Sequence, residues 1–202
     1  LARDWAWESD GGETTATVTL RDDLSWHDGS ALTASDVVFT YRFLTDTTLD
    51  QRERPVPAPR FRGRTSLVES VDRVDDRTIR FSFGKTVPEV AARAFTIPLL
   101  PEREWRPKAR EADLVGLDLF DGVTEALVWD NPEPVGSGVV RFERSIPEEQ
   151  LVCTRFDDHF LNRADAGELS GRVTDGVAFE ELVVRVVPSD VAAVELLAAG
   201  EV

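Results

Sequence analysis

The chain has 202 residues, enough for one sizeable domain or two small ones, each with a hydrophobic core. Hydrophobic residues make up 42% and charged residues 30% of it, a globular composition, and no apolar run approaches the ~20 residues that span a bilayer. The net charge of −15 disfavours nucleic-acid binding, because an acidic surface repels phosphate groups.

The choice of charged residues is itself informative. Lys85 and Lys108 are the only lysines, methionine is absent, and Asp and Glu together number 38. This composition resembles that of haloarchaeal proteins adapted to molar salt. At about 1 M salt the Debye length falls to about 3 Å, so the mutual repulsion of surface acids is screened. The composition therefore predicts a halophilic protein, and it says nothing about activity.

The first predicted elements are a strand, a turn and a helix. TTATVTLR alternates apolar residues with threonines over residues 14–21, which predicts a half-buried strand. The turn-forming stretch DDLSWHDGS follows it. Thr33 and Asp36 have the three-residue spacing of a capping box, so a helix is expected to begin after Thr33. Little polar surface remains between Val37 and Leu44, and this helix is expected to be covered on two sides.

A basic loop and a hairpin are expected next. Residues 52–64, RERPVPAPRFRGR, are rich in proline and arginine and predict an exposed loop or insertion. Residues 66–83 predict a hairpin that turns at Asp75 and Asp76 and returns on an alternating strand.

Two helices should follow the hairpin. Thr86 and Glu89 show a second capping-box spacing, with Pro88 in the first turn of a short helix that ends near Phe95. Another helix is expected to start after Pro101.

The last third of the chain predicts more strands. Residues 107–134 show the least regular pattern. Residues 136–145 and 148–156 predict two paired strands, and a Gly- and acid-rich loop is expected over residues 162–176. FEELVVRVV then predicts a buried strand, followed by a helix with Ser189 as its N-cap and Gly200 just past its end.

Candidate catalytic groups are few. His27 and Asp28 are neighbours, and side chains of adjacent residues in an extended chain point to opposite faces. His27 is predicted to be a turn residue and neither a catalytic group nor a metal ligand. With His159 as the only other histidine and Cys153 as the only cysteine, a zinc site is improbable, and Cys153 is predicted to be a buried structural thiol. An acid pair for glycoside chemistry stays open, but 38 acids make any one pair uninformative.

The segment LRDDLSWHDGSALTASDVVFTYRFL closely resembles the signature of family 5 extracellular solute-binding proteins, the oligopeptide-, dipeptide- and nickel-type receptors of ABC importers. The residues that match the signature are Leu20, Arg21, Trp26, Asp28, Gly29, Thr33, Ala34, Asp36, Val37, Phe39 and Thr40. PVGSGVVRFERS is similar to a second family motif. It matches that motif at Pro134, Gly136, Gly138 and Phe142 and departs from it at Val139 and Val140, where Pro-Tyr is usual.

The resemblance implies a mixed α/β (α+β) fold of the periplasmic-binding-protein type II, with only part of the first lobe present. Residues 1–133 would be most of the extra subdomain of that lobe. Residues 134–202 would be a fragment of its main α/β subdomain. A second lobe, joined by hinge strands, would close around the ligand in the full-length protein.

The resemblance also implies a function. The protein would be a monomeric, non-enzymatic receptor that needs no cofactor or metal. It would capture a peptide or similar small polar solute and then dock on an ABC permease. It would be extracellular and lipid-anchored at the cell surface, with signal and anchor ahead of Leu1.

Candidate ligand-binding residues are Gly136, Ser137 and Gly138, where a Gly-rich turn would permit close approach of a solute. A tight turn between strands is the alternative for these residues. Two other classes of function stay open from the residues alone: a secreted hydrolase of unknown specificity, and a structural or interaction module. A pocket with a perturbed acid pair would favour the hydrolase.

Overall fold

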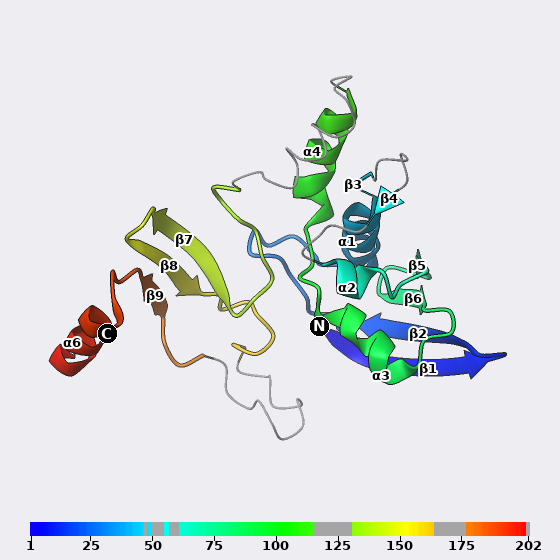
Figure 1. Cartoon of the computed structure of the whole chain (residues 1–202). Coiled ribbons are helices and arrows are strands. Elements are labelled where there is room, and N and C mark those ends of the chain that lie inside the picture. The colour runs from blue at the N-terminus through cyan, green and yellow to red at the C-terminus, as the bar shows by residue number, and fades with distance from the viewer. Residues whose placement is uncertain (47, 50–54, 57–60, 115–130, 164–176, 201–202) are drawn as a thin grey trace. The chain divides into compact units, whose positions relative to one another are not determined.

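The computed structural model (Figure 1) describes residues 1–46, 48–49, 55–56, 61–114, 131–163 and 177–200. The chain divides into two units, Leu1–Pro132 and Glu133–Val202. Each unit contains an antiparallel sheet of three or more strands, and the two sheets share no strand.

A four-stranded antiparallel sheet is the base of the first unit. Its strands, in spatial order, are β1 (Ala2–Asp10), β2 (Glu13–Leu20), β6 (Thr78–Ser82) and β5 (Ser70–Arg73). β2 and the β5–β6 hairpin lie where the sequence predicts them. Asp75 holds the hairpin turn, because its carboxylate accepts hydrogen bonds from the backbone N–H groups of Arg77 and Thr78, both at 2.8 Å. The bond from Arg77 is the largest of the effects that lower the pKa of Asp75.

β1 is an element that the sequence pattern does not predict. It pairs along its length with β2, with Trp5 opposite Val18 and Trp7 opposite Ala16. Every side chain of β1 except that of Trp7 is exposed. A strand at the edge of a sheet gains its hydrogen bonds from one neighbour and needs little buried surface, so it shows no apolar alternation.

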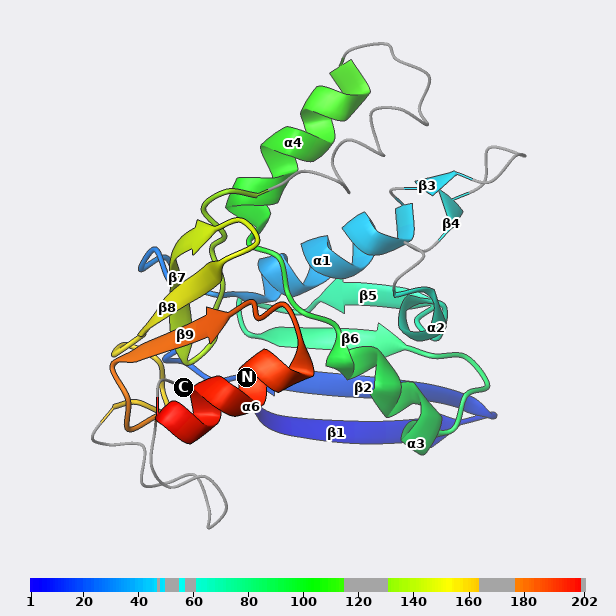
Figure 2. The ribbon, with the colours of Figure 1, turned by 60° about the vertical axis from the view of Figure 1, so that its left-hand side comes forward.

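Helix α1 (Ala34–Asp46) is covered on two sides, as predicted. Only Arg42 is exposed between residues 34 and 44. α1 contacts β5 and β6, and it also meets α4 (Glu102–Leu114), where the rings of Phe43 and Trp105 lie edge to face at 5.8 Å. Figure 2 shows α1 along the sheet and α4 beyond it.

The core between α1 and the sheet is aromatic. The rings of Tyr41 and Phe81 meet edge to face at 5.0 Å, and those of Phe81 and Phe95 meet at 5.1 Å. The Tyr41 hydroxyl donates a hydrogen bond to the carbonyl oxygen of Ala94 at 2.8 Å. Burial raises the pKa of Tyr41, which keeps this donor protonated. The large side chains most completely buried in this unit are those of Trp26, Thr40, Thr65, Ile79, Phe81 and Phe83.

The capping box predicted at Thr86 is wrong. The N-cap of α3 is Val87, which makes no side-chain capping bond, while Pro88 stands at the first helical position as predicted. The backbone N–H of Thr86 instead donates to the carbonyl of Phe83, in the turn after β6. Because the ring of proline already holds φ near the helical value, Pro88 can start α3 without a side-chain cap.

The short elements of this unit are β3 (Thr48–Leu49), β4 (Pro55–Val56), α2 (Arg62–Thr65), α3 (Pro88–Ala91) and η1 (Ala92–Thr96).

α4 passes through Pro107, where the sequence was expected to become irregular. A proline inside a helix removes one backbone hydrogen bond and crowds the preceding turn. Two contacts next to Pro107 hold the helix. Trp105 packs on Phe43, and the guanidinium carbon of Arg106 lies 5.4 Å from the ring centre of Phe39. Packing against α1 therefore outweighs the local cost.

The second unit contains the three strands and the final helix predicted for it. The strands, in spatial order, are β7 (Val140–Ile146), β8 (Gln150–Arg155) and β9 (Glu181–Arg185), all antiparallel, and α6 (Asp190–Ala199) follows. The Ser189 hydroxyl caps α6 by accepting from the Ala192 N–H at 3.2 Å, and Gly200 ends the helix with a φ of 72°. Most of the loop predicted over residues 162–176 lies outside the described residues.

The predicted burial of β9 is wrong. All five of its residues are exposed, including the apolar run from Leu182 to Val184. β8 is the middle strand of the sheet, and Val152 on it is fully buried. β9 forms the sheet edge and pairs only with β8 among the described residues, and nothing in that part of the chain covers its apolar run. No helix in the described ranges is long and apolar enough to cross a membrane.

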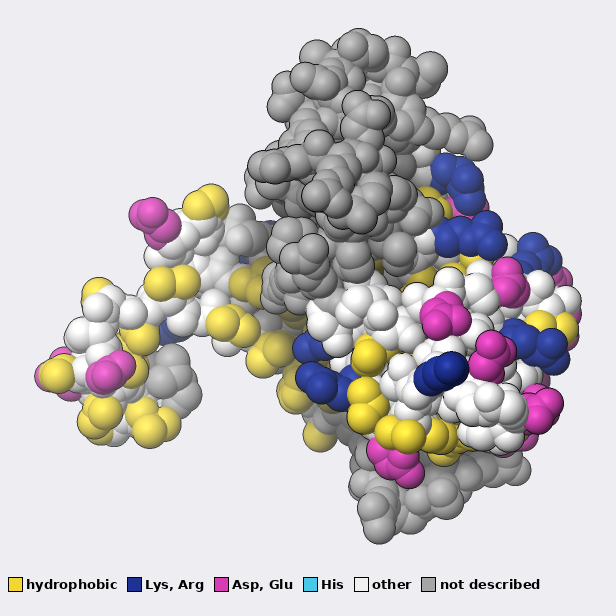
Figure 3. Space-filling model, turned by 45° about the vertical axis from the view of Figure 1, so that its right-hand side comes forward, with side chains coloured by type: hydrophobic (Ala, Val, Ile, Leu, Met, Phe, Trp, Pro, Cys, Tyr) yellow, Lys and Arg dark blue, Asp and Glu magenta, His cyan; other side chains and the backbone are white. Residues whose placement is uncertain are grey.

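Charges of both signs alternate on the described surface of the first unit. Figure 3 shows basic side chains, coloured dark blue, and acidic side chains, coloured magenta, interspersed on the face that it displays. Ion pairs join some of them, such as Arg77 with Asp22 at 3.6 Å and Arg42 with Asp72 at 3.7 Å. Exposed pairs of this kind add little stability each.

Candidate functional site

Backbone hydrogen bonds close the turn WHDGS of the signature segment. The Gly29 N–H donates to the Trp26 carbonyl at 2.9 Å, and the Trp26 N–H donates to the Ser30 carbonyl at 2.8 Å. Gly29 has a φ of 83°, in the left-handed region that favours glycine. His27 lies in this turn and is half-buried. The segment thus forms the turn that its residues predict, and the absence of a catalytic role for His27 stays a prediction.

Asp28 is a structural anion in this turn. Its Oδ1 accepts hydrogen bonds from the backbone N–H of Ser30 at 2.8 Å and from the Ser30 hydroxyl at 2.6 Å, and its Oδ2 pairs with the guanidinium of Arg103. Burial by itself would raise the pKa of Asp28. The bonds from Ser30 and the charge of Arg103 outweigh it, so the pKa lies below its ordinary value. At neutral pH Asp28 is ionised and does not serve as a proton donor.

Thr33 and Asp36 form the capping box predicted for α1. The Ser35 N–H donates to Thr33 Oγ1 at 3.3 Å, and the Thr33 N–H donates to Asp36 Oδ2 at 2.9 Å. The prediction that Thr33 caps this helix is confirmed. The other carboxylate oxygen of Asp36 accepts from the Glu102 N–H at 2.9 Å, at the start of α4.

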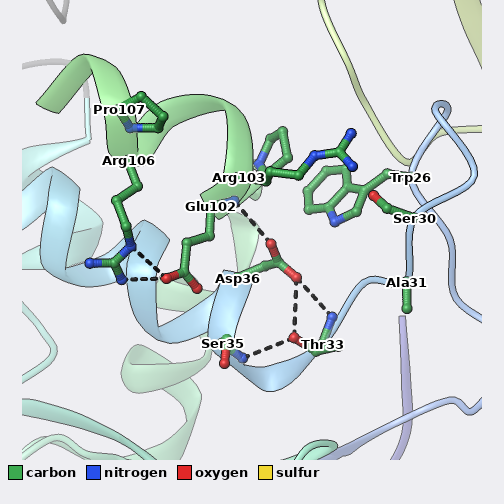
Figure 4. Close-up of a pocket in the computed structure, with 11 residues that line it drawn as sticks. Trp26, Ser30, Ala31, Thr33, Ser35, Asp36, Glu102, Arg103, Arg106 and Pro107 are labelled. Atoms are coloured by element: carbon green, nitrogen blue, oxygen red, sulfur yellow. Dashed lines mark hydrogen bonds and ion pairs between the residues drawn. The ribbon is translucent and has the colours of Figure 1, made fainter.

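A pocket of about 590 Å³ lies between the signature turn and the start of α4 (Figure 4). Its two carboxylates are engaged, Asp36 with the two helix starts and Glu102 with Arg106. Its lining contains no histidine or cysteine, so it holds no nucleophile–base pair of the Ser–His or Cys–His kind. The pocket residues are Trp26, Ser30, Ala31, Thr33, Ser35, Asp36, Pro101, Glu102, Arg103, Arg106 and Pro107. The arrangement offers shape and hydrogen bonding, and both of its carboxylates are already bonded to neighbouring protein groups.

Trp26 anchors the signature turn in the core, with only 1% of its surface exposed. Its indole Nε1 and the Ser25 hydroxyl are the buried side-chain polar atoms without a hydrogen-bond partner in the described part of the chain. An unpartnered buried donor costs free energy. The Nε1 atom is itself buried, so a solute in the pocket does not reach it in this conformation.

A second pocket of the first unit, about 440 Å³, is largely apolar. Aromatic side chains from β1, α1 and η1 line it, including those of Trp5, Trp7, Tyr41 and Phe95. Trp5 is 62% exposed, although its indole is mostly apolar. This pocket is suited to an apolar group and offers no charged side chain.

The predicted ligand residues Gly136, Ser137 and Gly138 lie just before β7. Gly136 and Ser137 are half-buried, and Gly138 is exposed. The φ angle of Gly138 does not lie in the left-handed region. A Cβ atom added there would meet the Val140 carbonyl oxygen at 3.7 Å, an ordinary contact. Backbone strain therefore does not require glycine at this position.

Asn162 is a residue near these glycines that sequence reasoning missed. Its Nδ2 donates to the carbonyl oxygens of Val139 and Phe156, at 2.9 and 2.8 Å, and its Oδ1 accepts from the Val177 N–H at 3.0 Å. It thus ties the start of β7 to the end of β8 and to the segment before β9. No local pattern signals this role, because the three partners lie 23, 6 and 15 positions away.

The remaining reactive residue types show no catalytic arrangement in the described ranges. His159 is buried, and its Nδ1 accepts from the Leu161 N–H at 3.1 Å. Cys153 is a free thiol and is half-buried, more open than predicted. Within the described ranges no group of three His, Cys, Asp or Glu side chains is placed to hold a metal ion.

Comparison with known families decides the class of the protein. Residues 1–202 match the family described as bacterial extracellular solute-binding proteins, family 5 middle. The chain belongs to the family 5 solute-binding proteins. The resemblance seen in the signature segment is confirmed, and so is the prediction of a non-enzymatic class, since this is a family of binding proteins.

Relatives of this family 5 chain are distant and longer. It is 26% identical over 142 residues to a binding protein of Brucella melitensis, an alignment that covers 70% of this chain and 19% of the relative. The substrate-binding protein CtaP of Listeria monocytogenes matches with 26% identity and a TM-score of 0.65, over 100% of this chain and 34% of that structure. A periplasmic oligopeptide-binding protein of Thermotoga maritima, crystallised with mannohexaose, matches with 25% identity and a TM-score of 0.68, over 100% and 31%. The chain thus spans about a third of the length of its solved relatives. The structural match to these relatives confirms the predicted mixed α/β fold class.

Proposed function

We propose that the chain is part of the first lobe of an extracellular receptor, which captures a peptide or similar small polar solute for an ABC permease. The observation that carries this proposal is the family match over residues 1–202. The signature segment supports it, because its polar residues build turns and helix caps and no catalytic pair. The hydrolase alternative has no such support.

The two units would belong to two subdomains of that lobe. Residues 1–133 would form most of the extra subdomain, and residues 134–202 would form a fragment of the main subdomain. The separate sheets of the two units favour this division. A second lobe would supply the opposing wall of the cleft, and the receptor would act as a monomer, lipid-anchored at the surface of a halophilic cell.

A peptide is the solute class that the signature resemblance favours. The Thermotoga relative is named an oligopeptide-binding protein, yet its crystal holds a mannohexaose. Peptides and oligosaccharides are therefore the two probes to compare. In this chain, the backbone of Gly136 and Gly138 and the small side chain of Ser137 would contact the solute.

Calorimetry of the full-length receptor in molar KCl tests the solute class. Peptides of two to six residues should bind, and mannohexaose should bind more weakly or not at all. Tight binding of the saccharide without peptide binding would overturn the peptide assignment. The 202-residue chain alone should bind weakly or not at all, because the second lobe would supply part of the contacts while the entropic cost of binding stays the same. Equal tight affinity in both would show that the site lies wholly in these residues.

The glycine variants test the site. Gly138→Ala should fold, since the added methyl group makes only an ordinary contact, but it should weaken peptide binding about tenfold if a solute approaches this backbone closely. Gly63→Ala is the matched control. Gly63 has open space around it in α2, and its replacement should leave affinity unchanged. Unchanged affinity in Gly138→Ala would remove Gly138 from the site.

A further inference from the structure

α4 begins without a side-chain cap of its own. The carbonyl of Pro101 accepts the first helical hydrogen bonds, from the N–H groups of Glu104 at 3.0 Å and Trp105 at 3.2 Å, so Pro101 occupies the N-cap. Proline has no side-chain acceptor, whereas the first N–H groups of a helix need acceptors from outside the helix. Another part of the chain must supply them.

Asp36 of α1, 66 positions earlier in the chain, supplies one of these acceptors. Its Oδ1 accepts from the Glu102 N–H at 2.9 Å, at the first residue of α4. Its Oδ2 accepts from the Thr33 N–H at 2.9 Å, as part of the α1 capping box. Figure 4 shows the carboxylate between the two helix starts, and Asp36 is only 7% exposed. A carboxylate at a helix N-terminus is also favoured by the helix dipole.

Thr40 makes a second bond to the same segment. It lies one turn after Asp36 on α1, and residues four apart share a helix face. Thr40 Oγ1 accepts from the Leu100 N–H at 2.9 Å and donates to the carbonyl oxygen of Asp36 at 2.7 Å. Thr40 is completely buried. Two side chains of α1 thus hold the backbone of residues 100–102.

We propose that Asp36 and Thr40 form a clamp that caps α4 from α1 and so positions it. Both are signature residues, and the clamp gives each a role outside its own helix. α4 supplies five of the residues that line the pocket beside Trp26, counting Pro101 at its N-cap. Loss of the clamp frees the start of α4 and opens that wall of the pocket, while the sheet and the rest of α1 persist.

Hydrogen exchange of the full-length receptor, followed by mass spectrometry, tests the clamp. Asp36→Asn offers one acceptor oxygen where the carboxylate offers two, and it removes the charge. Exchange of the α4 amides of Trp105, Arg106 and Lys108 should rise about tenfold or more, because a hydrogen bond to a buried charged group is lost. Thr40→Val should give a smaller rise in the same amides. Amides of the β2–β6 ladder should not change in either variant.

Two matched variants separate the clamp from general destabilisation. Thr33→Val removes the hydroxyl cap of α1 and leaves the Glu102 bond in place, so it should raise exchange in the first turn of α1 only. Glu102→Pro removes the N–H that Asp36 accepts, and proline is tolerated at a first helical position. Glu102→Ala keeps that N–H and loses only the pairing with Arg106.

The decisive comparison combines the variants. Asp36→Asn should raise α4 exchange in the Glu102→Ala background and add nothing in the Glu102→Pro background, where the bond is already absent. An equal increase in both backgrounds would show that Asp36 acts on α4 by another route and would overturn the clamp. Unchanged α4 exchange in Asp36→Asn would do the same.

Discussion

Single polar residues in the signature segment act on the backbone around them. Thr33 accepts from Ser35, Asp28 accepts twice from Ser30, and Asp36 accepts from the N–H groups that precede α1 and begin α4. These bonds satisfy donors that would otherwise lack partners inside a half-buried segment. The signature is therefore explained here by structure rather than by reactivity.

Replacement of Thr33 by alanine removes the hydroxyl that caps α1. The free energy of unfolding should fall by about 1 kcal/mol, the usual cost of losing a threonine N-cap. Denaturant unfolding of the chain in molar KCl measures it. Thr33→Ser, which keeps the hydroxyl, should stay close to wild type, and equal losses in both variants would contradict a capping role.

Asp28 should contribute stability that depends on pH. The folded-state pKa of Asp28 lies below its ordinary value of 3.8, so the ionised form is favoured by folding. The contribution is complete above the ordinary value and disappears as the pH falls through the folded-state value. The difference in melting temperature between wild type and Asp28→Asn should be constant above about pH 5 and shrink below pH 4. A difference in melting temperature that does not change with pH over this range would contradict a lowered pKa of Asp28 in the folded protein.

At the scale of elements, α4 shows tertiary contacts overriding local preference. Its N-cap is a proline, and Pro107 interrupts its interior. The helix nevertheless continues to Leu114, since Trp105 and Arg106 pack on the aromatic face of α1. Most helical stability in proteins comes from such packing.

Replacement of Pro107 by alanine should stabilise α4. Alanine restores the missing backbone N–H and relieves the clash with the preceding turn, a gain of up to about 3 kcal/mol. Hydrogen exchange of the α4 amides should slow. Pro88→Ala is the control, because Pro88 stands at the first position of α3, where proline is favourable and its removal should bring no gain. Faster exchange in Pro107→Ala would show that the proline is needed for packing in the pocket beside Trp26.

The whole molecule is dominated by its net charge of −15. The acids are dispersed among arginines on the surface, and exposed ion pairs offset only part of their repulsion (Figure 3). Ions in solution must screen the remaining repulsion between the acids.

Melting temperature should therefore fall as KCl is lowered from molar to millimolar concentrations. The Debye length grows from about 3 Å at 1 M to about 30 Å at 0.01 M, so the acids repel one another over longer distances. Circular dichroism of the chain measures the shift. Replacing exposed acids such as Glu8 and Glu143 by glutamine should make the melting temperature depend less on the KCl concentration. A wild-type melting temperature that does not change with salt would contradict halophilic adaptation.

Success in predicting the fold mostly followed the distance between interacting residues, although the local capping box at Thr86 failed, because Pro88 starts α3 without a side-chain cap. β2, the β5–β6 hairpin and the caps at Thr33 and Ser189 rest on alternation, turns and bonds within a few positions, and all are present. β1 was missed, because its ladder with β2 leaves no apolar pattern. The bonds of Asn162 were missed because its partners are set by the sheet of the second unit.

The sequence by itself determined the family, most of the local elements and the absence of a recognisable catalytic motif, since each depends on residue types at short fixed spacings. Tertiary structure alone decided that Asp36 caps two helices, that α4 runs through Pro107 and that β9 lies uncovered at a sheet edge. These outcomes depend on which surfaces meet, and Asp36 and Glu102 stand 66 positions apart. Spacing along the chain carries no information about contacts of that range.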